Sequence, residues 1–335
     1  MGIVQAMASG DAAIQARSGW VRKVGGGVAA FLLVALAAFL LHRTLSRYGL
    51  QEIVSSLQSI SAGRIALAGL FASVSYLCLT GFDWLALHYI RYKLPYRKAA
   101  LASFCSLSIV HNIGFAALSS GAIRYRFYSR WGVRAGDVAK IVIFCGTTVG
   151  LGLMVLAGFA LVVNYGVAAT ILGLSETMVI GLGGACLTLS IGYLALCRFV
   201  RTPLQLRKWH IELPPFHLAV AQLLIGPINF AFVAACLHQV LSSVSDVSYF
   251  DVAAVYVIAN VTALISHVPG GLGVIETVVL YLIPGVNVVG ALIAFRAIYF
   301  FCPLCIGGPL FLATELLLRR RSVSRRRNRR TRSEQ

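Results

Sequence analysis

Long stretches without a charged side chain dominate this sequence of 335 residues. No Asp, Glu, Lys or Arg occurs between Arg64 and Asp83, Lys140 and Glu176, Glu176 and Arg198, Glu212 and Asp246, or Asp251 and Glu276. A helix that spans a membrane needs about 20 mostly apolar residues, and each interval offers that length or close to it. Charged residues make up only 12% of the chain, against about 25% in soluble domains. The surface must therefore face lipid, and we predict an all-α, polytopic helical membrane protein.

The basic residues predict which helix ends face the cytoplasm, because short cytoplasmic loops are enriched in Lys and Arg. Residues 1–23 are basic and precede an apolar run at 24–41, which is too long for a cleaved signal peptide. Nine arginines lie in the tail at 319–335. We therefore expect both termini in the cytoplasm, flanking a transmembrane domain at 24–318. Few aromatic residues interleave with the tail arginines, so attraction to anionic headgroups is favoured over nucleic-acid binding.

Hydropathy and charge together predict six full crossings. These are expected at about 24–41, 65–90, 141–164, 177–197, 217–241 and 288–318. Between the first two, apolar residues recur at helical spacing at Leu50, Val54 and Leu57, which predicts an amphipathic helix at the membrane surface.

Two further apolar stretches, 99–123 and 252–284, are interrupted by polar or flexible residues. The first breaks at His111-Asn-Ile-Gly, and the second at His267-Val-Pro-Gly-Gly-Leu-Gly-Val-Ile-Glu276. Each stretch must begin and end on one side of the membrane if the loop charges are to fit, so we predict two re-entrant helical hairpins. With the flanking helices these hairpins form a possible inverted repeat, a plan that recurs in transporters. Eight simple crossings are the alternative.

Ionisable residues within membrane segments are costly and mark candidate functional sites. Glu276 is expected either to cap the helix after the Gly-rich turn or to pair with Arg124, with Arg296, or with a cationic or proton-coupled group. Glu276 and Arg296 are both candidate lipid-binding residues. Arg124 is interpreted either as a ligand for a lipid phosphate or as a cytoplasmic anchor. A lone histidine in an apolar run is often a structural residue with its hydrogen bonds satisfied, but His111 and His267 lie at matching breaks, so both are also candidate lipid-binding residues.

Other polar residues complete the predicted site and its surroundings. Ser120 and Gly271, which lie in the two interrupted stretches, are also assigned to lipid binding. Asp83 lies beside a tryptophan near a helix end and is expected to anchor that helix at the membrane interface, while Arg126 and Arg130 are interpreted as cytoplasmic anchors. All eight cysteines lie in or beside apolar stretches, so we expect small buried side chains and no metal or cofactor.

The break motifs carry a family resemblance. Together with Ser119-Ser-Gly-Ala-Ile-Arg-Tyr-Arg-Phe-Tyr128, they resemble the transmembrane region of lysylphosphatidylglycerol synthases, over about residues 24–318. The resemblance implies a flippase-like domain in the bacterial inner membrane. In bifunctional members this region moves aminoacylated phosphatidylglycerol between leaflets, and a soluble aminoacyl transferase domain follows it. Only an Arg-rich tail follows Leu318 in this chain, so we expect no transferase domain and no enzymatic activity.

The leading prediction is a translocator that moves or binds a phospholipid, a polyprenyl-linked lipid or a hopanoid-type lipid. Its expected partners are membrane lipids with anionic headgroups. One alternative is an integral membrane transferase or hydrolase that uses Ser119 or Ser120 with a histidine. Another alternative is an accessory subunit of a separate lipid-modifying synthase.

Overall fold

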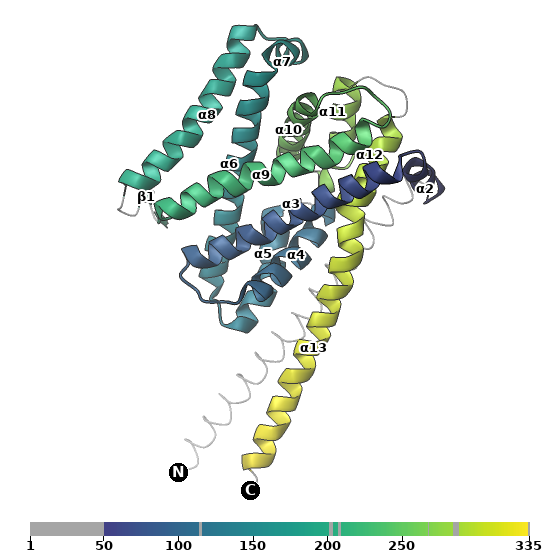
Figure 1. The fold of residues 1–335 in the computed structure, drawn as a ribbon. Coiled ribbons are helices and arrows are strands. Elements are labelled where there is room, and N and C mark those ends of the chain that lie inside the picture. Colours follow the sequence, from purple (N-terminus) through teal and green to yellow (C-terminus); the bar gives the residue numbers. More distant parts are fainter. Residues whose placement is uncertain are drawn as a thin grey trace.

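The architecture comes from a computed structural model of the chain. It describes residues 50–113, 116–200, 204–206, 209–266, 268–283 and 288–333. Figure 1 shows an assembly of helices, with one short antiparallel pair of strands, β1 (Leu204–Leu206) and β2 (Trp209–Ile211). The predicted crossing at 24–41 and the break histidine His267 lie outside the described residues.

The helices follow one another along the chain with short connections. They are α2 (Leu50–Gln58), α3 (Ala62–Tyr89), α4 (Tyr96–Ile113), α5 (Ala116–Tyr128), η1 (Ser129–Trp131), α6 (Ala135–Val163), α7 (Tyr165–Leu172), α8 (Glu176–Phe199), α9 (Phe216–Leu241), α10 (Tyr249–Ser266), η2 (Pro269–Gly271), α11 (Val274–Leu282), α12 (Val288–Arg296), η3 (Ala297–Phe301) and α13 (Cys302–Ser333). The helix expected at the membrane surface is present as α2, whereas α7 and the two strands were not predicted.

Six helices of the described chain are long and apolar enough to cross a membrane. Five of them correspond to predicted crossings: α3, α6, α8, α9 and the continuous helix that begins with α12. The sixth is α10, which the sequence assigned to the first arm of a hairpin. The prediction of a polytopic helical membrane protein is confirmed.

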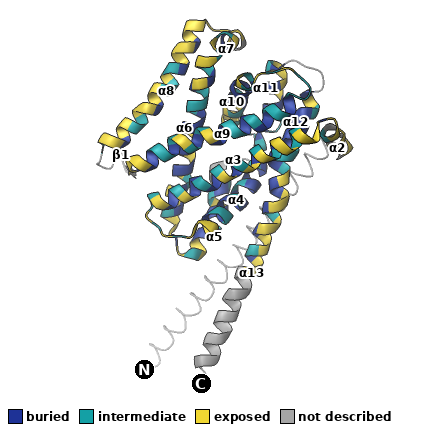
Figure 2. Ribbon diagram, in the orientation of Figure 1, coloured by how far each residue is buried: buried dark blue, intermediate teal, exposed yellow. Residues whose placement is uncertain are grey.

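Apolar side chains face outward along much of the surface, as a lipid environment requires. Helix α8 is the clearest case, because most of it is exposed (Figure 2). Leu189 and Ile191 are each 64% exposed and Phe199 is 79% exposed. A helix that is apolar on all sides is stable only inside a protein or in lipid, so this exposed face contacts the bilayer.

Small residues bring the long helices into close contact at the core. A Cβ atom added to Gly152 of α6 would lie 2.6 Å from the carbonyl carbon of Gly226 of α9. A Cβ atom added to Gly81 of α3 would lie 2.6 Å from a side-chain carbon of Ile225. Transmembrane helices associate largely through such packing, so α3, α6 and α9 form a closely packed centre.

Both interrupted stretches fold as two helical arms that pack on each other, in the order that the sequence predicts. The first hairpin consists of α4 and α5, and the second of α10, η2 and α11. In the view of Figure 1 they lie on opposite sides of α3 and α9, which run side by side. The first break begins later than expected, because α4 continues through His111 and ends at Ile113.

The two hairpins meet at their breaks. The last turn of α4 contacts η2, and a Cβ atom added to Gly270 would lie 3.0 Å from the carbonyl oxygen of His111. The final long helix passes this junction and contains a π-helical segment, η3, at that level. Such segments are often found at functional sites, since they release backbone carbonyls from the helical ladder.

Candidate functional site

The most polar feature of the hairpin junction is the guanidinium of Arg296. It makes a two-point ion pair with Glu276, in which Nε donates to Oε1 and Nη2 donates to Oε2 at 3.0 Å. Nη1 also donates to the carbonyl of Gly270 and Nη2 to that of Gly271, both at 2.9 Å. The side chain therefore joins α12 to the turn and to α11. The predicted partnership between Glu276 and Arg296 is confirmed.

Glu276 also caps helix α11, so its two predicted roles coexist. Its Oε2 accepts a hydrogen bond of 2.8 Å from the backbone N–H of Gly273. Gly270, Gly271 and Gly273 all have positive φ angles, between +59° and +83°. This left-handed backbone favours glycine, which explains why the sequence is rich in glycine here. The turn exposes its carbonyls to Arg296 because it is not helical.

Aromatic rings surround His111 on the other side of the junction. Its Nδ1 lies 3.2 Å from the hydroxyl of Tyr76 on α3, with which it shares a hydrogen bond. The imidazole stacks on Tyr299, with ring centroids 6.0 Å apart. The guanidinium carbon of Arg296 lies 4.9 Å from the ring centroid of Phe300, a cation–π contact. The ring of Phe300 therefore contacts both the imidazole and the guanidinium.

The π-helical segment supplies carbonyls to neighbouring helices. The Tyr76 hydroxyl donates to the carbonyl of Tyr299 at 3.3 Å, and Asn112 Nδ2 donates to that of Phe300 at 3.3 Å. The Tyr299 hydroxyl lies 2.9 Å from Ser75 Oγ, which donates to Asn229 Oδ1 at 2.7 Å. A polar network thus links α3, α4, α9 and η3 inside the apolar core.

Sequence reasoning missed these network residues. A tyrosine or serine in an apolar stretch carries no charge and resembles any other partly polar helix residue. The usable signal was the recurrence of hydroxyl and amide side chains, such as Ser75, Tyr76 and Asn229, in helices that are otherwise apolar. A buried polar group needs a hydrogen-bond partner, which predicts a network but not its members.

A second buried ion pair holds the first hairpin. Arg124 on α5 donates from Nε to Asp83 Oδ1 at 2.9 Å and from Nη2 to Oδ2 at 2.7 Å. The Tyr128 hydroxyl donates to Oδ1 at 2.9 Å, and the Cys145 thiol lies 3.9 Å from Oδ2. Asp83 is fully buried and Arg124 is 3% exposed. The prediction that Asp83 is an interface anchor is wrong, because α3 turns its carboxylate inward toward this arginine.

The guanidinium of Arg124 is therefore occupied in this structure. Capture of a lipid phosphate by Arg124 stays a prediction that requires the Asp83 pair to open. Ser120 precedes Arg124 by one turn and is buried, with its carbonyl accepting a hydrogen bond of 3.2 Å from Ser106 Oγ. It lies in the packing of α5 against α4.

A third cluster joins α5 and η1 to α13. Arg126 and Arg130 each donate to Glu315 Oε1 at 2.6 Å, and Arg126 Nε donates to Oε2 at 3.1 Å. The interpretation of these two arginines as cytoplasmic anchors stays a prediction, to which the structure adds a shared carboxylate partner on the last helix. Arg126 is 15% and Arg130 29% exposed in the side chain, so the cluster lies at the edge of the core.

Cysteine placement only partly follows the sequence expectation. Four cysteines are buried, Cys78 and Cys186 are partly buried, and Cys302 and Cys305 are exposed on the outer surface of α13. Burial is thus wrongly predicted for the last two, because α13 packs through its other side. Within the described ranges, no three His, Cys, Asp or Glu side chains are grouped so as to hold a metal ion.

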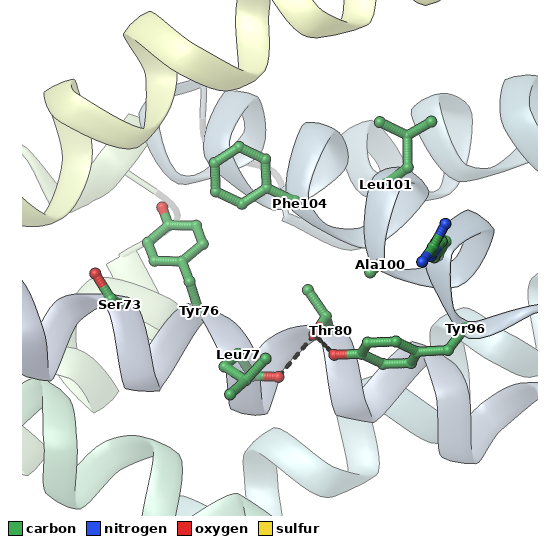
Figure 3. Close-up of a pocket in the computed structure, with 9 residues that line it drawn as sticks. Ser73, Tyr76, Leu77, Thr80, Tyr96, Ala100, Leu101 and Phe104 are labelled. Atoms are coloured by element: carbon green, nitrogen blue, oxygen red, sulfur yellow. Dashed lines mark hydrogen bonds between the residues drawn. The ribbon is translucent and has the colours of Figure 1, made fainter.

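A groove of about 560 Å³ lies between α3 and α4. Figure 3 shows Tyr76, Leu77 and Thr80 along one wall, and Leu101 and Phe104 along the other. The lining also includes Ser73, Tyr96, Arg97 and Ala100. One wall residue, Tyr76, is also the hydrogen-bond partner of His111. The groove therefore reaches the hairpin junction at one end.

Comparison with known proteins agrees with this architecture. A sequence model described as "Lysylphosphatidylglycerol synthase TM region" matches residues 27–307. The chain belongs to this family. The predicted resemblance is confirmed, and both hairpins and both buried ion pairs lie inside the matched span.

Two relatives support the assignment to the lysylphosphatidylglycerol synthase TM region family. "Uncharacterized protein slr0712" of Synechocystis sp. is 32% identical over 305 residues, which cover 90% of this chain and 95% of the relative. "Inner membrane protein YbhN" of Escherichia coli is 30% identical over 249 residues, covering 72% of this chain and 77% of the relative. The chain is thus an integral membrane protein of a family whose name refers to lipid synthesis.

Proposed function

We propose that this protein translocates a phosphate-bearing lipid across the bacterial inner membrane through the hairpin junction. The observation that carries the proposal is the position of Arg296. Its guanidinium holds a non-helical turn where two packed hairpins meet, within a bundle of apolar helices. Polar groups and broken helices at such a place are typical of transport pathways. The family name, which refers to a lipid synthase, and the inner-membrane relative support a lipid-related function in the membrane.

The chemistry of Arg296 suits exchange between the protein and a phosphate. Two of its hydrogen bonds go to the neutral carbonyls of Gly270 and Gly271. A phosphate oxygen is a stronger acceptor than a carbonyl, because the bond is charge-assisted on both sides. A headgroup that reaches Arg296 would displace the turn carbonyls and leave Glu276 in place. The turn would then be free to move away from the last turn of α4.

In this proposal, the Asp83–Arg124 pair keeps the first hairpin in place while the turn of the second hairpin moves. It joins α5 to α3, and the Tyr128 hydroxyl adds a further hydrogen bond to the carboxylate. A buried carboxylate with these partners is costly to separate from its arginine. The first hairpin would therefore stay in place while the turn of the second moves. Broken helices that move against a fixed scaffold give alternating access to a central site.

Lipid translocation in proteoliposomes tests the proposal. Phosphatidylglycerol carrying a fluorescent headgroup is reconstituted in both leaflets, and an impermeant reductant then bleaches the outer leaflet. Wild-type protein is expected to expose the inner pool to the reductant. Glu276→Gln and Arg296→Gln are each expected to slow this loss at least tenfold. Arg296→Gln removes the guanidinium that would bind the phosphate, and Glu276→Gln removes the carboxylate that holds this guanidinium in position. Tyr281→Phe is the matched control, because Tyr281 lies on α11 and is 83% exposed.

The outcome distinguishes the junction from a general effect on folding. All variants are compared only if they elute from gel filtration as the wild type does. Wild-type rates in both Glu276→Gln and Arg296→Gln would remove the junction from the transport mechanism. Absence of movement by the wild-type protein, with every tested phosphate-bearing lipid, would reject translocation itself.

A further inference from the structure

The groove between α3 and α4 has features that the junction does not explain. Its walls are almost entirely apolar, with Leu77, Leu101 and Phe104 among the lining residues. A single cationic side chain, Arg97, also lines it. Arg97 is exposed and belongs to the first turn of α4. The groove therefore combines an apolar channel with one positive charge, which is the complement of an anionic amphiphile.

Arg97 differs from the other arginines discussed above. Arg124, Arg126, Arg130 and Arg296 each pair with a carboxylate. No described carboxylate pairs with Arg97. The connection at 91–98 contains four basic residues and no acidic one. A guanidinium offers five donors in a planar fork that fits phosphate oxygens, so this one is available for an external anion.

Aromatic side chains indicate the level of Arg97 relative to the bilayer. Trp84 and Tyr96 are 40% and 41% exposed, and their ring centroids lie 6.3 Å apart in an edge-to-face contact. Half-exposed Trp and Tyr side chains concentrate at the level of lipid headgroups. From Arg97 to Phe104 helix α4 rises by about 10 Å. The groove thus leads from headgroup level into the hydrocarbon region.

We propose that this groove binds a membrane phospholipid, with the phosphate on Arg97 and an acyl chain between Leu77, Leu101 and Phe104. The Thr80 and Tyr96 hydroxyls, which lie 2.7 Å apart across the groove (Figure 3), face the ester region of the lipid. The occupant is a lipid and not a free phosphate, because only a lipid uses both the cation and the apolar walls.

The groove also defines where a lipid would approach the junction, a point that rests on the proposed function. Tyr76 lines the groove and shares a hydrogen bond with His111, whose ring stacks on Tyr299. A lipid seated in the groove lies next to the polar network of the hairpin breaks. The groove would then be the entrance from one leaflet. Binding at Arg97 itself does not depend on translocation.

Retention of phosphatidylglycerol, counted by native mass spectrometry, tests the site. The full chain is extracted from nanodiscs containing equal amounts of phosphatidylglycerol and phosphatidylethanolamine. The wild type is expected to retain phosphatidylglycerol, and Arg97→Gln to retain about tenfold less, since a charge-assisted hydrogen bond of this kind is lost. Ala100→Trp, which fills the groove without changing charge, is expected to have a similar effect. Lys93→Gln is the matched control, because it removes one exposed charge from the same connection without lining the groove.

The results separate this site from the proposed function. Retention at the wild-type level in both Arg97→Gln and Ala100→Trp would overturn the groove assignment. An equal loss in Lys93→Gln would also overturn it, because diffuse surface charge would then explain the binding. Loss confined to Arg97→Gln and Ala100→Trp supports the site, even if the wild-type protein moves no lipid in proteoliposomes. In that case the translocation proposal fails and the binding site stands.

Discussion

Each of the two hairpins contains a buried ion pair, but the two pairs connect different elements of the fold. In the first hairpin, Arg124 pairs with Asp83 of the preceding long helix. In the second, Glu276 pairs with Arg296 of the following long helix. Both charges follow a glycine by three residues, in Gly121-Ala-Ile-Arg124 and Gly273-Val-Ile-Glu276. The same local pattern therefore supports ion pairs of opposite polarity.

The remaining partners make the difference between the pairs. The Asp83 carboxylate has two further partners, Tyr128 of α5 and Cys145 of α6. The Arg296 guanidinium is completed by two carbonyls of the turn itself. The first pair therefore fixes one helix against another, whereas the second joins α11 to α12 and also holds the loop before α11. A loop held by hydrogen bonds that a ligand can replace can also be released. We therefore infer that the Asp83–Arg124 pair fixes the first hairpin permanently, whereas the Glu276–Arg296 pair holds the turn of the second hairpin reversibly.

The largest expected effect on stability is in the first hairpin. Asp83→Asn leaves Arg124 buried without a counter-charge, which typically costs about 3–5 kcal/mol. We expect the free energy of unfolding, measured by denaturation in mixed micelles, to fall by this amount. The double variant Asp83→Leu with Arg124→Met should recover most of the loss, because no charge stays unpaired. A small effect of Asp83→Asn on the free energy of unfolding would mean that the pair does not fix the first hairpin in place.

Loss of the second pair is expected to cost less stability and more function. In Glu276→Gln the guanidinium of Arg296 keeps both turn carbonyls and its contact with Phe300. Because these carbonyls still accept hydrogen bonds from the buried guanidinium, we expect a loss below the roughly 3–5 kcal/mol that follows when a buried charge loses its counter-charge. We expect unfolding in the same mixed micelles to show this smaller loss, together with the slowed lipid movement described above. If Glu276→Gln lowers the free energy of unfolding more than Asp83→Asn does, the proposed difference between the two hairpins is contradicted.

The smallest effect is expected at the edge of the bundle. Glu315→Gln weakens the contacts of α13 with Arg126 and Arg130, whose side chains are partly exposed. Solvent reaches both arginines and screens their charges, so we expect a loss near the upper end for exposed pairs, about 1 kcal/mol, although the Glu315 side chain itself is only 8% exposed. Thr314→Ala is a matched control on the neighbouring position, since Thr314 bonds only within its own helix in the described contacts. A loss as large as that of Asp83→Asn would show that this cluster, and not the buried pair, fixes the first hairpin.

Much of the architecture could be predicted because charged side chains are excluded from segments that cross a membrane. Intervals free of charge marked the long helices, and glycine and proline marked the second break. The Glu276–Arg296 pair could also be predicted, since each was a conspicuous charge in an apolar segment with few possible partners.

Other features could not be read from the sequence. Asp83 lies beside a tryptophan near a helix end, so its inward orientation depends on how α3 is rotated, which only packing decides. The junction of α4 with η2 joins segments about 160 residues apart, and no local pattern encodes such a contact. The π-helical carbonyls of Tyr299 and Phe300 are equally invisible, because the side chains there are ordinary aromatic residues. The groove at Arg97 likewise exists only once two helices are placed side by side.

Contact between the hairpin breaks, and its role in transport, can be tested in one measurement. In a background lacking the native cysteines, cysteine is introduced at Asn112 and at Gly270, where an added Cβ would lie 3.6 Å from the Cα of Asn112. The two Cβ atoms would therefore lie within about 5 Å of each other, close to the separation of about 3.5–4.5 Å that a disulfide needs. The account predicts that oxidation crosslinks the two positions and stops lipid movement in proteoliposomes, and that a reductant restores it. Lipid movement that continues at the uncrosslinked rate in fully crosslinked protein would contradict it.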